Sequence, residues 1–320
     1  MKLSVVISAY NEEKKIKDCL ESVKWADEII FVDNSSIDST LSIAKKYTSH
    51  IFTRPNNPML NVNKNFGFTK ATHEWILSLD ADERVTNELA QEIKKAIKSE
   101  NPQPSKPPLV KGVGGIYEGR FISGFWLPRK NIIFGKWIQH TGWYPDYQLR
   151  LFRKSQGRFE EKHIHEMIKL NGEAGYLKNP ISHYNYETIA QFLHKTIVIY
   201  APNEASSKLQ NGYNFNYMDS IRFPWNEFLK RYFAEKGYKD GLHGLMLSIL
   251  MSFYHFIVFA YIWEKKMFVE DGDENITRGL KEELKKSGKE LKYWLDAKEI
   301  EQEKNALRKT VLKIKRKLQI

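Results

Sequence analysis

The sequence lacks several features that define common protein classes. It has one cysteine, Cys19, so an internal disulfide is excluded and a reducing compartment is expected. The histidines and this cysteine do not have zinc-ligand spacing. The opening residues MKLSVVISAYNEE hold an apolar run that is short and ends in acids, unlike a signal peptide. We therefore expect the N-terminal domain in the cytosol.

Glycine-rich phosphate loops and RNA-binding signatures are also missing. The turn after the first apolar run reads SAYNEE, which excludes the G-x-G-x-x-G of a dinucleotide-binding domain, and no P-loop occurs. No K/R-G-F/Y-G/A-F pattern is present. The net charge of +11 favours an anionic partner, either nucleic acid or an anionic membrane surface. We expect the membrane surface and no nucleic acid.

The first hundred residues alternate between apolar runs and helical patterns, which predicts an α/β domain with a parallel, doubly wound sheet. Strands are expected at Leu3 to Ala9, Glu28 to Asp33 and His50 to Arg54, and within Glu74 to Glu83. Helical stretches follow them: KKIKDCLESVK, LSIAKKY, NVNKNFGFTKA and NELAQEIKKAIKS. The length allows one large domain with an appendage, or two domains.

Polar residues follow the first, second and fourth of these strands. Right-handed crossovers place the three strand ends at one edge of the sheet, where ligands of such sheets bind. The edge carries Tyr10, Asn11, Asp33, Asn34, Asp80 and Asp82. Asp80 and Asp82 offer hard oxygen ligands for Mn²⁺ or Mg²⁺, which in turn holds phosphates. Alternatively, Asp80 begins a turn and Asp82 caps a helix starting near Thr86, but the clustering at one edge favours the metal.

Four segments carry a family resemblance: ISAYNE, VDNSSIDST, KNFG at Lys64 to Gly67, and LDADE. In this order they resemble the motifs of inverting nucleotide-sugar glycosyltransferases of the large GT-A-fold family 2, which includes polysaccharide and lipopolysaccharide enzymes. Many members have two adjacent acids after the second strand, and the second acid often reads the uracil ring. Here Asp33 is followed by Asn34, although asparagine can still hydrogen-bond a pyrimidine edge.

The segment NPQPSKPP, Asn101 to Pro108, predicts a loop, and short aromatic strands are expected after it: GGIYEGRFISGFW, NIIFGKWIQ and YPDYQLRLFRK. WYPDYQLRLFRK, followed by RF, an HE pair and ISHYNY, resembles the bacterial lipopolysaccharide-core β-glucosyltransferase group. The resemblance implies a GT-A-type mixed sheet over residues 1–188. Residues 1–100 would form the nucleotide-sugar half and residues 109–188 the acceptor half.

The resemblance also implies the metal, base and donor residues. Asp82 would ligate the metal, Asp80 would contact ribose or reach the metal through water, and His183 would be a late ligand. Glu166 is the expected base, with Glu161, Glu160 and Asp146 as rivals, although many relatives read Glu-Asp where this chain reads His-Glu. His165 is expected to orient neighbours. The donor would contact Ala9, Tyr10, Asn11, Glu12, Asp33, Asn34, Lys64 and Asp80.

Aromatic and basic residues of the acceptor half are candidates for the acceptor site, with ordinary core packing or a solvated face as alternatives. The predicted acceptor residues are Trp137, Trp143, Tyr144, Asp146 and Arg150. Tyr147 can also stack on a sugar, and Arg129, Lys130 and Lys136 can meet acceptor phosphates.

From Tyr186 onward the sequence predicts helices, with a membrane-associated region at 189–270 and a basic tail at 271–320. Gly241 to Trp263 carries no formal charge and spans about 34 Å as a helix, long enough to cross a bilayer. Crossing would put the basic tail outside the cell, against the positive-inside tendency. We expect a helix in the membrane plane, broken near Ser252. A spanning helix and a helix packed in a soluble dimer are the alternatives.

The tail from Thr277 to Ile320 predicts one or two amphipathic helices. After Glu303 it contains cations and no acid, which suits anionic lipid heads or acceptor phosphates, with a solvated helix as the alternative.

Together these features predict a metal-dependent, inverting transferase at the cytoplasmic face of the membrane. It would move a hexose from a UDP-glucose-like donor to a lipopolysaccharide-type or lipid-linked glycan, and it can form a homo-oligomer through its C-terminal helices. One alternative is a polyprenyl-phosphate sugar synthase, although anchored synthases usually have paired spanning segments. Another is a non-catalytic basic membrane-binding protein, which would have lost the metal motif that Asp80 and Asp82 preserve.

Overall fold

The structure is a computed structural model that describes residues 1–57, 59–98, 122–161, 166–270 and 273–318. The chain divides into two compact units. The sheet unit comprises residues 1–133 and 144–185, and the helical unit comprises residues 134–143 and 186–320. The predicted loop at Asn101 to Pro108, the start of the first aromatic stretch and His165 lie outside the described residues.

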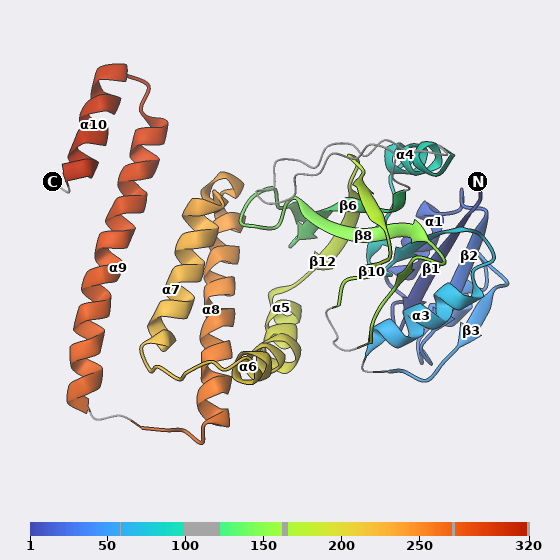
Figure 1. Ribbon diagram of the computed structural model, residues 1–320, viewed down its shortest axis with the longest axis horizontal. Coiled ribbons are helices and arrows are strands. Elements are labelled where there is room, and N and C mark those ends of the chain that lie inside the picture. Colours follow the sequence, from blue (N-terminus) through green and yellow to red (C-terminus); the bar gives the residue numbers. More distant parts are fainter. Residues whose placement is uncertain (58, 99–121, 162–165, 271–272, 319–320) are drawn as a thin grey trace. The chain divides into compact units, whose positions relative to one another are not determined.

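The first half of the sheet is parallel and runs in the order β3-β2-β1-β4 (Figure 1). Its strands are β1 (Leu3–Ala9), β2 (Glu28–Asp33), β3 (Ile51–Thr53) and β4 (Trp75–Leu79). The connecting helices are α1 (Ile16–Ser22), α2 (Thr40–Ala44), α3 (Leu60–Lys70) and α4 (Asn87–Lys98). Every residue of β2 and β4 is buried, as expected for a sheet covered on both faces. The prediction that the first, second and fourth strands end at one edge of the sheet is confirmed, because β1 pairs in parallel with both β2 and β4.

Beyond β4 the sheet becomes mixed, as predicted. The order continues through β8 (Asp146–Arg153), β6 (Ile122–Ile133), β12 (Ile181–Tyr186) and β5 (Glu83–Arg84). β8 is antiparallel to both β4 and β6, and β11 (Glu173–Tyr176) is parallel to β6. β9 (Gly157–Arg158) and β10 (Lys169–Leu170) form a separate two-stranded sheet. β6 has 12 residues and is longer than the short strand that the sequence predicts.

The antiparallel pairing of β12 with β5 brings a distant part of the chain to the end of β4. His183 is the register partner of Glu83, and the Tyr184 amide donates to the Asp82 carbonyl at 2.9 Å. His183 therefore lies beside the DAD turn although a hundred residues separate them in sequence.

The KNFG element owes its glycine to close packing of α3 on the sheet. A Cβ on Gly67 would lie 2.6 Å from Val6 Cγ1 and 3.0 Å from Val32 Cγ2. Glycine therefore lets α3 approach β1 and β2, and one turn earlier it brings the buried Lys64 to the strand ends.

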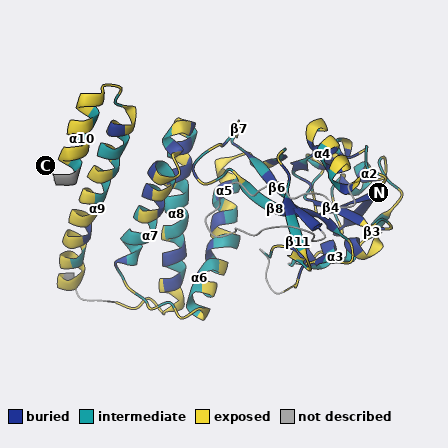
Figure 2. Ribbon diagram, turned by 45° about the horizontal axis from the view of Figure 1, so that its top comes forward, coloured by how far each residue is buried: buried dark blue, intermediate teal, exposed yellow. Residues whose placement is uncertain are grey.

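The helical unit contains mostly helices, as predicted from Tyr186 onward. They are α5 (Ile189–Lys195), η1 (Thr196–Tyr200), α6 (Ala201–Gln210), α7 (Asp219–Leu229), η2 (Lys230–Ala234), η3 (Gly237–Asp240), α8 (Leu242–Lys265), α9 (Asp273–Gln302) and α10 (Ala306–Leu318). Figure 2 shows that α9 and α10 are largely exposed. The predicted break near Ser252 is wrong, because α8 is continuous there and the Ser252 hydroxyl donates to the Pro224 carbonyl at 2.7 Å.

Residues 134–143, which contain β7 (Lys136–Trp137), belong to the helical unit and are held by one buried carboxylate. Asp240 accepts the amides of Gln139 at 3.2 Å and His140 at 2.8 Å, and its backbone carbonyl accepts Lys136 Nζ at 2.7 Å.

Gly67→Val tests the close approach of α3. We expect it to lower the free energy of unfolding by about 2 kcal/mol, because the added methyl groups must displace Val6 or Val32. Gly288→Ala, in α9, is the matched control, because a Cβ there meets nothing within 4 Å. It should raise stability by about 0.5 to 1 kcal/mol. Urea unfolding followed by circular dichroism measures both, and a stabilising Gly67→Val would refute the packing argument.

Candidate functional site

The turns that follow β1 and β2 are joined by side-chain hydrogen bonds. Asn11 has a positive φ of 54°, a backbone conformation that asparagine tolerates well. Its side-chain Oδ1 accepts the Ile37 backbone amide at 2.9 Å, and its own backbone amide donates to Ser36 Oγ at 3.1 Å. The Glu12 amide donates to Thr40 Oγ1 at 2.7 Å. The ISAYNE and VDNSSIDST segments therefore form one continuous polar surface.

Within this surface Tyr10 is exposed, whereas Ala9, Asp33 and Asn34 are buried. Asp33 accepts the Ser36 amide at 3.3 Å. Asn34 Oδ1 accepts hydrogen bonds from Ser8 Oγ at 3.2 Å and from Asn63 Nδ2 at 2.8 Å. The side-chain oxygen of Asn34, the residue that the family resemblance places at the uracil-reading position, thus already accepts hydrogen bonds inside the protein.

Asp80 lies between two cations. Lys64 Nζ bonds its Oδ1, and Arg150 Nη2 bonds its Oδ2 at 2.5 Å. Burial works to raise the pKa of Asp80, but Arg150 and Lys64 outweigh it and hold the pKa well below its usual range. Asp80 is therefore ionised, and both its oxygens are engaged by cations.

Asp82 faces His183 instead. Its Oδ2 lies 3.4 Å from His183 Nε2, and the other ring nitrogen, Nδ1, lies 2.7 Å from Asn131 Oδ1. Asn131 Nδ2 donates to Asp146 Oδ2 at 3.2 Å, which fixes the amide so that its oxygen receives the Nδ1 proton. Burial works to raise the pKa of Asp82, but a proton on His183 Nε2 outweighs it through a hydrogen bond and its charge, so the pKa is lowered. Without that proton the Nε2 lone pair points toward the Asp82 carboxylate, and a cation between the two groups would take the place of the proton.

The alternative that Asp82 caps the following helix does not hold. α4 begins at Asn87, and the Leu89 amide in its first turn donates to Thr86 Oγ1 at 3.3 Å. Asp80 does begin a turn, as the same alternative expected, because the Glu83 backbone amide donates to the Asp80 carbonyl at 3.0 Å.

Glu83 connects Asp80 to the rest of the site. It is fully buried, and its Oε1 accepts Arg150 Nη2 at 2.9 Å and lies 3.8 Å from Arg129 Nη1. Arg129 in turn binds Asp146 Oδ2 through Nη2 at 2.6 Å. A chain of charge pairs and hydrogen bonds therefore runs from Asp80 through Glu83 and Asp146 to His183.

The sequence reasoning missed Glu83 and Asn131. The signal for Glu83 was its place directly after the DAD segment, whereas Asn131 had no local signal. Arg150 and Asp146, which were predicted to contact the acceptor, are bound to Asp80 and to Arg129 respectively.

Asn65 of α3 holds the segment around Phe159, next to the candidate bases Glu160 and Glu161. Asn65 binds both backbone polar groups of Phe159, and its Nδ2 also donates to Glu161 Oε1 at 2.7 Å. Glu166 Oε2 accepts the Glu161 amide at 2.7 Å. Glu160 Oε1 pairs with Lys169 Nζ at 2.5 Å.

The predicted acceptor residues divide between the two units. Tyr144, Asp146 and Arg150 belong to the sheet unit. Trp137 and Trp143 belong to the helical unit, where Trp143 packs edge-to-face on Tyr186 with ring centroids 6.4 Å apart. Neither described unit therefore contains the whole predicted set.

The Asp82–His183 pair fits a divalent cation. A carboxylate oxygen and an imidazole nitrogen face each other; the carboxylate suits Mn²⁺ or Mg²⁺, and the imidazole favours the transition metal Mn²⁺. In the part of the chain that the structure describes, no group of three His, Cys, Asp or Glu residues could hold a metal. Such ions commonly complete their coordination with phosphate oxygens and water, so a two-residue anchor is sufficient for a phosphate-bound ion.

Comparison with known proteins identifies relatives of the chain. Residues 4–165 match the family model described as Glycosyl transferase family 2. An uncharacterized glycosyltransferase of Rickettsia typhi is 28% identical over 274 residues, which cover 82% of this chain and 87% of the relative. The lipopolysaccharide core biosynthesis glycosyltransferase LpsC of Rhizobium meliloti is 22% identical over 270 residues, which cover 82% of this chain and 92% of LpsC.

Among solved structures, Staphylococcus aureus TarS 1–349 in complex with UDP-GlcNAc aligns over 78% of this chain and 79% of TarS, with 18% identity. The TM-score is 0.40, a likeness too low to extend the assignment.

Arg150→Met tests the charge compensation at the end of β4. We expect it to lower the free energy of unfolding by about 3 to 5 kcal/mol, because Asp80 and Glu83 lose their shared cation. Arg153→Met, on the same strand, removes a pair with the more exposed Glu74 and should cost about 1 kcal/mol. Urea unfolding at pH 7 compares the two variants, and equal losses would contradict the role given to Arg150.

Proposed function

Because the chain belongs to glycosyl transferase family 2, we propose that this glycosyltransferase moves a hexose from a UDP-sugar, UDP-glucose or a close analogue, to a glycan with inversion at the anomeric carbon. The observation that carries the proposal is the arrangement at the shared end of β1, β2 and β4. There Asp80 is neutralised by two cations, and Asp82 Oδ2 faces His183 Nε2. We expect the donor diphosphate to lie beside this carboxylate and imidazole.

In the proposed mechanism Asp82 and His183 would hold Mn²⁺ or Mg²⁺, and Asn131 keeps the His183 ring in the tautomer that can ligate. When bound, the ion would supply positive charge for the departing diphosphate. Asp80 would contact the ribose or reach the metal through water, and Lys64 adds a cation on the donor side. The strand-end surface receives the nucleotide through Tyr10, Asn11, Glu12 and Asp33, with Ala9 and Asn34 shaping its floor.

Glu166 is the proposed general base, which takes the proton of the acceptor hydroxyl as that oxygen attacks the anomeric carbon. Ion pairs disfavour two of its rivals as bases, because Lys169 binds Glu160 and Arg129 binds Asp146. Glu161 remains the rival. The Glu161 amide holds one oxygen of the Glu166 carboxylate and so orients it.

The proposed acceptor is a lipopolysaccharide-type or lipid-linked glycan, reached at the cytoplasmic face of the cell membrane by a peripheral or monotopic enzyme. The alignment with LpsC covers most of both chains, and the name of LpsC supports the lipopolysaccharide class. Trp137, Trp143 and Tyr144 remain the proposed sugar-stacking residues. A polyprenyl-phosphate sugar synthase is less well supported, because within the described residues only α8 is long and apolar enough to cross a membrane.

Asp82→Asn tests the metal assignment. We expect Mn²⁺-dependent UDP release from a panel of UDP-sugars to fall by about a thousandfold, roughly 4 kcal/mol of transition-state stabilisation. Mn²⁺ affinity measured by calorimetry in the presence of UDP should fall as well. Asp18→Asn is the control, because the Asp18 side chain is 73% exposed and its ion pair with Arg84 is long, at 3.9 Å. Unchanged turnover in Asp82→Asn would remove the metal site.

Glu166→Gln tests the base. The turnover rate should fall by about 100- to 10,000-fold, because no carboxylate remains to take the proton from the attacking hydroxyl. The dissociation constant of the UDP-sugar, measured by calorimetry, should stay near the wild-type value. Glu161→Gln is the matched variant from the same loop. If Glu161→Gln abolishes turnover and Glu166→Gln does not, the base is Glu161.

A further inference from the structure

The long helix α8 has its polar side chains turned toward the protein. Ser252 Oγ donates to the Pro224 carbonyl of α7, and Tyr254 Oη bonds Glu204 of α6. His255 Nε2 lies 3.7 Å from Glu227 Oε2 of α7. The residues on the opposite face are apolar and between 39% and 71% exposed: Leu242, Met246, Ile249, Phe253, Phe256 and Trp263.

This exposed face is continuous. Its members alternate at spacings of four and three residues, with Ala260 completing the series, so they lie along one side of the helix. No charged residue occurs between Leu242 and Trp263, a length of about 33 Å. A helix on the surface of a water-soluble domain has the opposite polarity, with its apolar stripe toward the core. We therefore expect something other than water to cover this face of α8.

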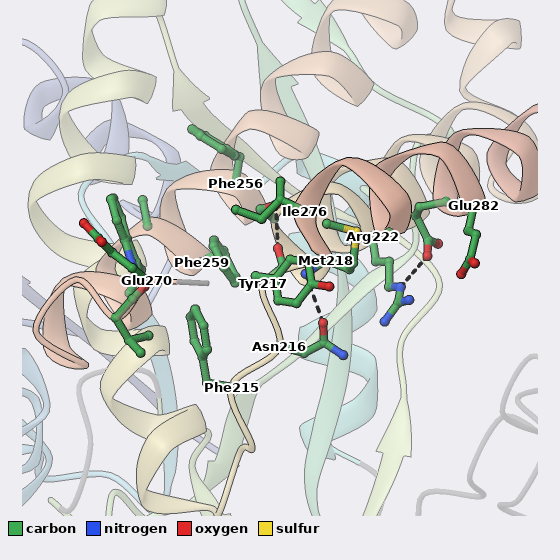
Figure 3. A pocket seen from close by; sticks show the side chains of 16 residues that line it. Phe215, Asn216, Tyr217, Met218, Arg222, Phe256, Phe259, Glu270, Ile276 and Glu282 are labelled. Carbon is green, nitrogen blue, oxygen red and sulfur yellow. Dashed lines mark hydrogen bonds and ion pairs between the residues drawn. The ribbon is translucent and has the colours of Figure 1, made fainter. Parts of the chain in front are cut away.

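The apolar surface extends into a groove of the helical unit (Figure 3). This groove of about 1100 Å³ is lined by Phe256, Phe259 and Trp263 of α8, and by Met218 and Ile276. An ion pair between Arg222 and Glu283, 2.7 Å apart, closes part of its wall. The groove offers space for an apolar chain beside the exposed face.

Ion pairs packed against the middle of α8 determine how the helix can meet a bilayer. Glu227 binds Arg231 at 2.5 Å and lies near His255, and the neighbouring Lys230 side chain is 59% exposed. A spanning orientation would carry these charges into the hydrocarbon core, where each is costly. An orientation in the membrane plane leaves them on the water side of the helix.

The C-terminal end of α8 adds bulky apolar side chains next to cations. Met267 and Phe268 have positive φ values of 57° and 53°, a backbone conformation that costs non-glycine residues about 1 kcal/mol each. They are 84% and 54% exposed and directly follow Lys265 and Lys266. Apolar groups beside lysines suit the boundary between acyl chains and anionic headgroups.

A second helix repeats the pattern independently. Leu307, Val311 and Ile314 of α10 share one face and are 81%, 50% and 53% exposed. Cations flank that face, and no acid follows Glu303. Such a helix is complementary in both polarity and charge to an anionic lipid surface.

We propose that the exposed face of α8 is a membrane-contact surface that lies in the plane of an anionic bilayer, with α10 as a second contact. The inference rests on the membrane location given in the proposed function, and it names the residues and the lipid chemistry that produce that location. The donor site and the metal take no part in it.

The test is flotation of the full chain with vesicles of phosphatidylcholine containing one third phosphatidylglycerol. For Ile249→Asp/Phe253→Asp, the lipid concentration needed for half-binding should rise at least tenfold, because two carboxylates replace buried apolar contacts. Leu60→Asp in α3 is the matched control, since Leu60 is 45% exposed and Ile249 is 46% exposed. Wild-type binding by the double variant would overturn the proposal.

Site-specific labelling gives a second measurement. Cys19 is the single cysteine and is buried, so a Phe253→Cys variant can carry one environment-sensitive dye. The emission should shift to the blue when the anionic vesicles are added, and the same dye at Leu60→Cys should not respond. The absence of a shift at position 253 would place α8 away from the lipid.

Other outcomes would show whether lipid or a second copy of the chain covers the exposed face of α8. They also distinguish a failure of the membrane-contact proposal from a failure of the proposed enzyme function. A wild-type dimer that Ile249→Asp/Phe253→Asp converts to a monomer, with vesicle binding intact, would assign the face to a second copy. Resistance to carbonate extraction would indicate a spanning helix. UDP release by the double variant on a soluble acceptor should match wild type. If the wild type releases no UDP but still binds vesicles, the proposed function fails while the surface stands.

Discussion

The sheet unit depends on the way Arg150 compensates two neighbouring acids. Asp80, whose side chain is 32% exposed, and the fully buried Glu83 lie at the end of β4, within one turn of each other. Carboxylates withdrawn from water in this way need a paired cation. Arg150 reaches both from β8, at 2.5 Å and 2.9 Å. The antiparallel pairing of β8 with β4 is therefore an electrostatic requirement of the site as well as a feature of the fold. With Asp80 and Glu83 compensated in this way, Asp82 is left to face His183.

The KNFG element shows how one helix serves fold and site together. Gly67 allows α3 to approach β1 and β2, and Lys64 then reaches Asp80. Asn65, the next residue, binds the loop that contains Phe159 and Glu161. A four-residue segment therefore fixes the distance between the strand-end carboxylates and the loop of candidate bases.

The parallel half of the fold could be predicted because its signals are local. Apolar runs and turn residues gave the bounds of β1 and β2, and crossover handedness gave the shared edge. The family resemblance led us to expect His183 near Asp82, but its bond to Asn131 and its pairing with Glu83 could not be predicted, because no local pattern specifies how β6 and β5 reach it. The same reason explains the error at Ser252, where a tertiary bond to Pro224 satisfies the hydroxyl and the helix continues.

In the helical unit buried charges are also paired with one another, but here the result is an apolar outer face instead of a polar site. Its ionic groups pair inward, as Glu227 does with Arg231, so the outward face of α8 can lose water without stripping any ion. Removing water from that face then yields the full hydrophobic gain, about 25 cal/mol per Å² of apolar surface. On the proposed lipid surface the chain would meet a lipid-linked acceptor at a raised effective concentration. The proposed membrane contact therefore depends on the packing of α7 against α8, which turns charge inward.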